Sequence, residues 1–124
     1  MLVDSKHLPE DYLADINRWR TRGPSCKVNL ALDGLPDFPA IPKSKRALLR
    51  GSIEIAPSVD YLEQAYDDAK YGGWSKRPFM DALMPSLLDP GMAPPGKHVM
   101  SLFVQYADAD LKGGWTDQKK AEFL

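Results

Sequence analysis

The chain has 124 residues, of which 44% are hydrophobic and 27% charged, as is ordinary for a single globular domain and unlike a disordered chain. Its 16 basic and 17 acidic residues leave a formal net charge of −1, so no field of the whole molecule attracts nucleic acid or an anionic membrane. Cys26 is the single cysteine, which excludes an intramolecular disulfide and with it a secreted disulfide scaffold.

The same residue content predicts the cellular compartment of the protein. The first residues contain acidic side chains and no apolar signal-peptide core. No apolar run approaches the roughly 20 residues that a membrane-spanning helix needs. We therefore expect one domain over residues 1–124, in the cytoplasm, with no membrane span and no nucleic-acid partner.

The first element is a helix predicted between Leu8 and Gly23. Pro9 suits its first position, and the acidic residues after it suit the positive end of the helix dipole. An apolar stripe at near-helical spacing should pack against the rest of the domain. The stripe consists of Tyr12, Ile16 and Trp19.

Two strands and a basic connection follow. Residues 27–33 alternate between apolar and polar side chains, which predicts a half-buried strand, and residues 51–57 form a second, short strand with Ile53 and Ile55 on one face. Between them, the basic cluster from Lys43 to Arg50 is most simply a solvated loop. It lacks the glycines and the following helix start of a phosphate-binding loop.

The second helix, over residues 59–71, has the clearest boundaries in the chain. Ser58 is a suitable N-cap and Gly72 a suitable C-terminal stop. Its apolar stripe has the spacing i, i+3, i+4, i+7 of a helix with one buried face. That stripe consists of Leu62, Ala65, Tyr66 and Ala69.

The last two strands enclose a loop rich in proline and glycine. Residues 77–86 form a strand candidate with Met80, Ala82 and Met84 on one face. After the loop, residues 97–107 are apolar on both faces, with Met100, Leu102, Val104 and Tyr106 on one and Val99 and Phe103 on the other. Such a strand is central in its sheet, or something bulky covers its second face.

The tail begins a short helix that Thr116 can cap. It stops after about two turns, which predicts that the chain is cut from something longer. Together the elements predict an α+β fold. We expect a small mixed or mainly antiparallel sheet of about four strands with two to three helices.

No residue pattern has the spacing of a catalytic or metal site. His7 and His98 are the two histidines, and each lacks a metal ligand at suitable spacing. The chain has no Gly-x-Ser-x-Gly, Walker-type or Gly-x-Gly-x-x-Gly motif. Composition and spacing alone therefore assign no catalytic, cofactor-binding or metal residue.

A resemblance to a known family adds a function. The stretch "PSLLDPGMAPPGKHVMSLFVQY", preceded by "YLEQAYDDAKYG", closely resembles an internal segment of the phytoene-desaturase-related FAD-dependent oxidoreductases. That family includes the pyridine-nucleotide–disulfide oxidoreductase domain proteins. The stretch "LPEDYLADINRWRTRGPSCKVNLALDGLPDFPA" also looks like it. The resemblance covers nearly the whole chain and weakens in residues 41–50.

The resemblance implies that this chain corresponds to part of a substrate domain, a sheet with helices that roofs the flavin. In the family, FAD is held by a Gly-x-Gly-x-x-Gly Rossmann unit and a glycine-rich C-terminal segment, and this chain contains neither. The implied cofactor of the parent is FAD, and none is expected on this chain alone. Without flavin, the fragment is expected to be inactive.

On this hypothesis, Phe103 and Gln105 are the candidates for lining the parent's substrate pocket. The competing interpretation makes Phe103 a core residue and Gln105 a polar residue at the strand end. Two other hypotheses remain: a binding or self-associating module without catalysis, and one half of a split flavoenzyme. All of them predict that a second copy or a flavin-domain partner covers the apolar face of strand 99–106.

Overall fold

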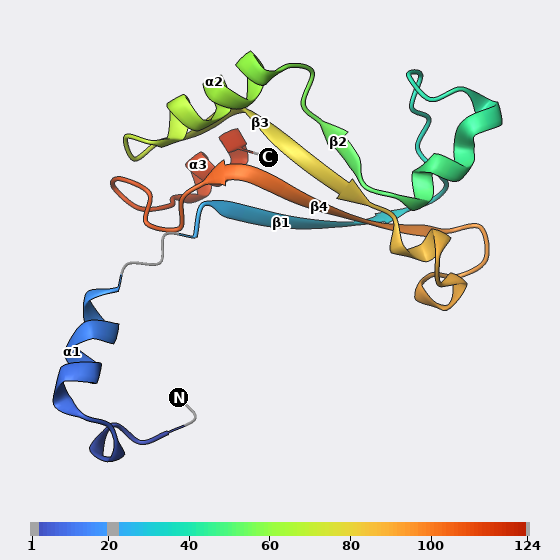
Figure 1. Ribbon diagram of the computed structural model, residues 1–124. Coiled ribbons are helices and arrows are strands. Elements are labelled where there is room, and N and C mark those ends of the chain that lie inside the picture. The colour runs from blue at the N-terminus through green and yellow to red at the C-terminus, as the bar shows by residue number, and fades with distance from the viewer. Residues whose placement is uncertain (1–2, 20–22, 124) are drawn as a thin grey trace.

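The computed structural model describes residues 3–19 and 23–123, and their core is a four-stranded antiparallel sheet (Figure 1). The strand order is β1-β4-β3-β2, and every pairing is antiparallel. The strands are β1 (Ser25–Leu32), β2 (Ile53–Ile55), β3 (Trp74–Leu83) and β4 (His98–Ala107), and the α-helices are α1 (Glu10–Arg18), α2 (Val59–Ala69) and α3 (Asp117–Phe123). The expected α+β class is confirmed, and the sheet is purely antiparallel rather than mixed.

Strand β4 is an interior strand, as its two apolar faces predict. It pairs with β1 on one side and β3 on the other, so that Val28 and Ala82 flank Leu102, and Lys27 and Asp81 flank Phe103. Since side chains alternate along a strand, these two rows lie on opposite faces of the sheet. We call the face of Leu102 the core face and the face of Phe103 the open face.

The core face carries the hydrophobic core of the protein. Buried Met100, Ala82 and Met84 form one cluster with Leu49. Half-buried side chains complete it: Leu30, Leu32, Phe38, Ile41, Ile53, Leu87 and Leu102. The alternation predicted for β1 and β3 is therefore confirmed.

Leu49 corrects the prediction of a solvated basic loop. Residues Lys43–Arg50 form 3₁₀-helical turns, η2, interrupted by a non-helical Lys45. The four basic side chains of the segment are exposed, while Leu49 is only 4% exposed and packs in the core. The basic side chains are solvated as predicted, but the Leu49 side chain packs the segment against the sheet.

Helix α2 begins where its sequence predicts and ends at Ala69, two residues before the predicted end. The Ser58 hydroxyl accepts a hydrogen bond from the Tyr61 amide at 3.1 Å, as an N-cap does. Ala65 and Ala69 are buried, and the Ser75 hydroxyl of β3 donates to the Ala65 carbonyl at 2.5 Å. Ser75 therefore fixes the helix to the sheet through a buried hydrogen bond.

The proline- and glycine-rich loop consists of two short 3₁₀ turns, η3 (Pro85–Leu87) and η4 (Pro90–Met92). The Asp89 carboxylate accepts a hydrogen bond from the Gly91 amide at 2.9 Å, which closes the second turn. Met84, directly before η3, is buried in the core, so the loop is anchored at its start. The loop thus returns the chain from β3 to the antiparallel β4.

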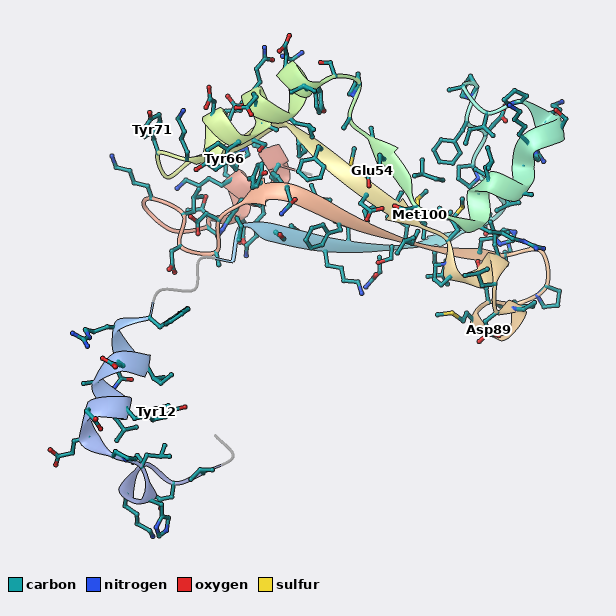
Figure 2. All side chains as sticks on the ribbon, viewed as in Figure 1. Tyr12, Glu54, Tyr66, Tyr71, Asp89 and Met100 are labelled. Atoms are coloured by element: carbon teal, nitrogen blue, oxygen red, sulfur yellow. The ribbon has the colours of Figure 1, made fainter. Side chains whose placement is uncertain are left out.

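Helix α1 forms within the predicted range but ends at Arg18, since the Trp19 backbone is already extended, and its apolar stripe is not in the core. Tyr12, Ile16 and Trp19 are 50%, 51% and 76% exposed, and no residue of α1 is buried. Figure 2 shows Tyr12 on α1, well apart from Met100 in the sheet. The part of the predicted helix at residues 20–22 lies outside the described residues. The helical spacing of apolar residues predicted the helix correctly, but it did not predict what the helix packs against.

The C-terminal helix α3 is capped by Thr116, whose hydroxyl accepts from the Lys119 amide at 3.2 Å. Before it, Trp115 packs against Trp74, with ring centroids 5.8 Å apart. Each tryptophan follows a Gly-Gly pair, and the Lys112 amide donates to the Gly72 carbonyl at 3.1 Å. Trp74 and Trp115 therefore have a packing role.

Candidate functional site

The open face of the sheet carries both predicted pocket residues. Phe103 lies on the central strand β4 between Lys27 of β1 and Asp81 of β3, and Gln105 lies two residues further along the same strand. Residues two apart on a strand share a face. The structure therefore places Phe103 and Gln105 on one surface, as the alternation predicted.

The open face exposes two large apolar side chains. Phe103 is 46% exposed and Leu83 is 45% exposed. The next row of the same face holds Leu83, Ser101 and Asn29 side by side on three strands. The Phe103 ring can contact the flat apolar part of a ligand, while the charges of Lys27 and Asp81 on either side orient the ligand's polar groups.

Gln105 is engaged by the protein itself. Its side-chain amide donates a hydrogen bond to the Ser25 hydroxyl at 3.0 Å, and the residue is partly buried. Phe103 has the larger exposed surface of the two and is the stronger candidate for ligand contact. The assignment of either residue to a substrate pocket stays a prediction.

An aromatic group at the end of the open face was missed by the sequence analysis. Phe79 pairs with Gln105 across the sheet, which places its ring on the open face. Tyr106 packs on Phe79 with ring centroids 5.8 Å apart, and Tyr66 of α2 packs on Tyr106 at 5.5 Å. The alternation had placed Tyr106 with Met100 instead, and no signal in the sequence marks this departure.

Ser86 and His98 form a pair that resembles part of a hydrolytic site. The Ser86 hydroxyl lies 3.2 Å from the His98 Nδ1, but it also accepts a hydrogen bond from the Val99 amide at 3.1 Å. Ser86 is 6% exposed, and no carboxylate hydrogen-bonds His98 within the described residues. A catalytic triad needs an accessible nucleophile and an oriented base, so the pair anchors the loop to β4.

The charged groups of the described chain do not form a metal site. Within residues 3–19 and 23–123, no group of three His, Cys, Asp or Glu side chains could hold an ion. The pKa of the Lys70 ammonium is raised by its hydrogen bond to Asp67 at 2.5 Å. Lys70 is a surface group, so this shift reflects a local ion pair.

The helices of the described residues include none with the length and hydrophobicity to cross a bilayer. The longest, α2, has 11 residues, well short of the ~20 that a span requires.

Comparison with known proteins relates the chain to two curated mammalian proteins. It is 37% identical to mouse "Pyridine nucleotide-disulfide oxidoreductase domain-containing protein 2" over 126 aligned positions, and 40% identical to the rat protein of the same name. Each alignment covers 96% of this chain and 22% of the relative. The chain thus spans about a fifth of the length of these relatives.

These relatives confirm the expected similarity to pyridine-nucleotide–disulfide oxidoreductase domain proteins. Their names do not mention phytoene desaturases, so that narrower relationship stays a prediction. No protein-family profile matches the chain, and no solved structure matches it.

Proposed function

We propose that the chain is the substrate-side sheet of an FAD-dependent oxidoreductase related to the phytoene desaturases, with flavin held by another part of the enzyme. The similarity to two oxidoreductase-domain proteins covers nearly all of this chain and a fifth of theirs. The observation that carries the proposal is the asymmetry of the sheet. One face is closed by the chain's own core, while the other presents Phe103 and Leu83.

The residues of this chain do not fit a dinucleotide. A flavin pyrophosphate is typically bound where a glycine-rich turn joins a parallel strand to a helix N-terminus. All strand pairings here are antiparallel, and the sequence contains no Gly-x-Gly-x-x-Gly. We therefore assign no cofactor-binding residue and no chemical step to this chain, which we propose to be inactive alone.

The part that we propose for the chain is to form one wall of the substrate pocket. Phe103 would supply an apolar contact, and the Gln105 amide, already oriented by Ser25, would supply a polar one. Oxidation by flavin needs a substrate held in a fixed orientation and shielded from water. A rigid sheet face with an aromatic centre suits that positioning role.

The experiment is a chimaera in which this chain replaces the matching segment of the rat relative. If the proposal is correct, the chimaera purifies with bound flavin, measured by its visible absorbance, whereas the isolated chain does not bind added FAD. A folded chimaera that has lost its flavin, while the unmodified rat protein retains it, would contradict the proposal.

A second comparison tests the pocket wall. In a chimaera whose flavin is reduced when substrate is added, Phe103→Ala should lower the rate of flavin reduction or raise the KM while leaving the flavin content unchanged. The matched control is Val59→Ala, which removes an exposed apolar side chain of α2 that is 73% exposed. Equal rates of flavin reduction and equal KM values for the two variants would show that Phe103 does not line the pocket.

A second candidate function is a self-associating module without catalysis. For both candidates we propose a cytoplasmic location. The exposed Phe103 and Leu83 support the self-associating module, because large apolar side chains exposed together on one sheet face are typical of an interaction surface. A concentration-dependent dimer in analytical ultracentrifugation, abolished by Phe103→Ser, favours this candidate if the chimaera fails. Formation of a complex with a separate flavin-domain chain would favour the split enzyme instead.

A further inference from the structure

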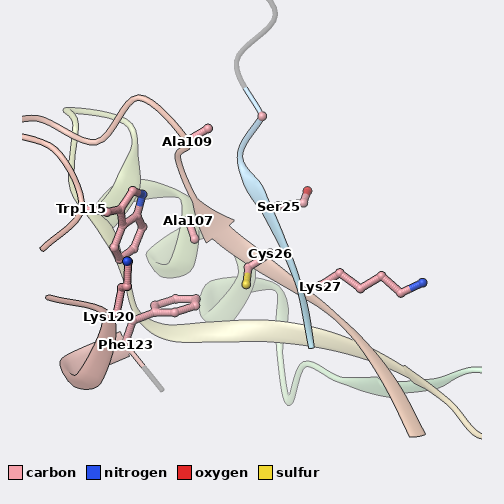
Figure 3. A pocket seen from close by; sticks show the side chains of 9 residues that line it. Ser25, Cys26, Lys27, Ala107, Ala109, Trp115, Lys120 and Phe123 are labelled. Atoms are coloured by element: carbon pink, nitrogen blue, oxygen red, sulfur yellow. The ribbon is translucent and has the colours of Figure 1, made fainter. Parts of the chain in front are cut away.

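We propose that a hollow between β1, the end of β4 and α3 is a binding site for a flat aromatic carboxylate, independent of the function proposed above. The hollow has a volume of about 430 Å³, within the range of small-molecule sites. Figure 3 shows its principal side chains. They are Ser25, Cys26, Lys27, Ala107, Ala109, Trp115, Lys120 and Phe123.

This hollow is distinct from the surface of Phe103. Cys26 pairs with Val104 across the sheet, and Lys27 pairs with Phe103, so Cys26 lies on the core face. In Figure 3 the Cys26 sulfur points towards the Phe123 ring, whereas the Lys27 side chain extends away from it. Ser25 and Lys27 of the open face also line the hollow, but Phe103 and Gln105 do not, so a ligand there would leave Phe103 and Gln105 uncovered.

The aromatic walls of the hollow are held in place before any ligand binds. The Trp115 indole nitrogen donates a hydrogen bond to the Asp108 carbonyl at 2.9 Å. Its ring packs between Trp74 and Phe123, at centroid distances of 5.8 Å to each. Preformed walls reduce the ordering cost of binding, and the small side chains of Ala107 and Ala109 leave room for a ring beside them.

The charge at the hollow selects an anion. Lys27 and Lys120 lie among its lining residues, and no acidic side chain does. The Lys120 ammonium lies 3.4 Å from the Asp117 carboxylate, but both side chains are exposed, at 58% and 103%. Exposed pairs of this kind are worth about 0–1 kcal/mol. Lys120 can therefore exchange Asp117 for a ligand carboxylate.

The test uses 2-naphthoate and its uncharged analogue naphthalene-2-carboxamide, titrated into the full chain and followed by ¹H–¹⁵N NMR. The expected shifts centre on the Trp115 indole and the amides of Cys26 and Ala107. Lys120→Gln should weaken 2-naphthoate binding about two- to fivefold, as the loss of an exposed ion pair predicts, and leave carboxamide binding unchanged. Lys45→Gln, on η2, is the matched charge control.

A second pair of variants tests the location. Cys26→Trp fills the hollow and should abolish the binding of both compounds, whereas Asn29→Trp adds the same side chain on the opposite face of the same strand and should not. If Cys26→Trp does not fold, the Lys120→Gln comparison decides. No shifts at millimolar ligand, shifts centred on Phe103, or equal affinities of Lys120→Gln and the parent chain for 2-naphthoate would overturn the proposal.

Discussion

The two faces of strand β4 differ in what covers them, although the sequence makes both apolar. Met100 on the core face is 6% exposed, and Phe103 on the open face, three residues later, is 46% exposed. The core face is closed from within the chain, by Leu49 of η2 and the segment of Phe38 and Ile41. The difference teaches that an apolar strand face reports a need for cover, without identifying what supplies it.

The largest expected effect concerns the covered face. Met100→Ala removes a side chain from the centre of the core and should lower the free energy of unfolding by about 2–5 kcal/mol, because buried Met-to-Ala changes leave a cavity. Chemical denaturation monitored by circular dichroism measures this. A loss no greater than that of Phe103→Ala would show that the two faces are equally covered in solution.

Ser75→Ala tests how α2 is held on the sheet. The Ser75 hydroxyl donates to the Ala65 carbonyl and accepts from the Tyr106 amide at 2.7 Å, in a side chain that is 1% exposed. Removing it leaves buried backbone groups without a partner, at a cost of about 1–3 kcal/mol. Hydrogen exchange of the Tyr106 amide should accelerate in the variant. Unchanged exchange would mean that another group satisfies this amide.

A smaller effect is expected at the start of α2. Ser58→Ala removes the N-cap acceptor of the Tyr61 amide and should destabilise the fold by about 1 kcal/mol. Ser58→Asp should retain most of the stability, because a carboxylate also caps and favours the positive helix end. Thermal unfolding distinguishes the two variants, and equal melting temperatures would dispute the role of Ser58.

The smallest effect is expected on the open face. Phe103→Ser should change the unfolding free energy of the isolated monomer by less than about 1 kcal/mol, since Phe103 is already 46% exposed. It should instead reduce self-association at high protein concentration. Denaturation in dilute solution and light scattering in concentrated solution check the two parts. A loss matching that of Met100→Ala would place Phe103 in a core.

Much of the sheet could be predicted because its side chains follow simple periods. The alternation through Val28, Leu30 and Leu32 identified a half-buried strand, and Ser58 located a helix start. These signals work because strand alternation and N-capping are local properties of the backbone.

The parts that escaped prediction depend on contacts between distant segments. The burial of Leu49 requires the η2 segment to reach Ala82 and Met84, which its charge pattern does not indicate. Trp19 shows the reverse case. Its apolar stripe predicts burial, but no other segment of the described chain packs over Trp19, which stays 76% exposed. The predicted surface of Phe103 and Gln105 was found by alternation alone, whereas the contact of Tyr106 with Phe79 needs the folded sheet.

The most direct measurement is the solvent access of position 103 in the isolated chain and in the chimaera with the rat relative. With Phe103→Cys in a Cys26→Ser background, thiol labelling followed by peptide mass spectrometry reports this access, and Val59→Cys provides an exposed control in both proteins. If the open face is a wall of a larger enzyme, Phe103→Cys is labelled rapidly in the dilute isolated chain and protected in the chimaera. Equal labelling rates at position 103 in the two proteins would contradict that placement.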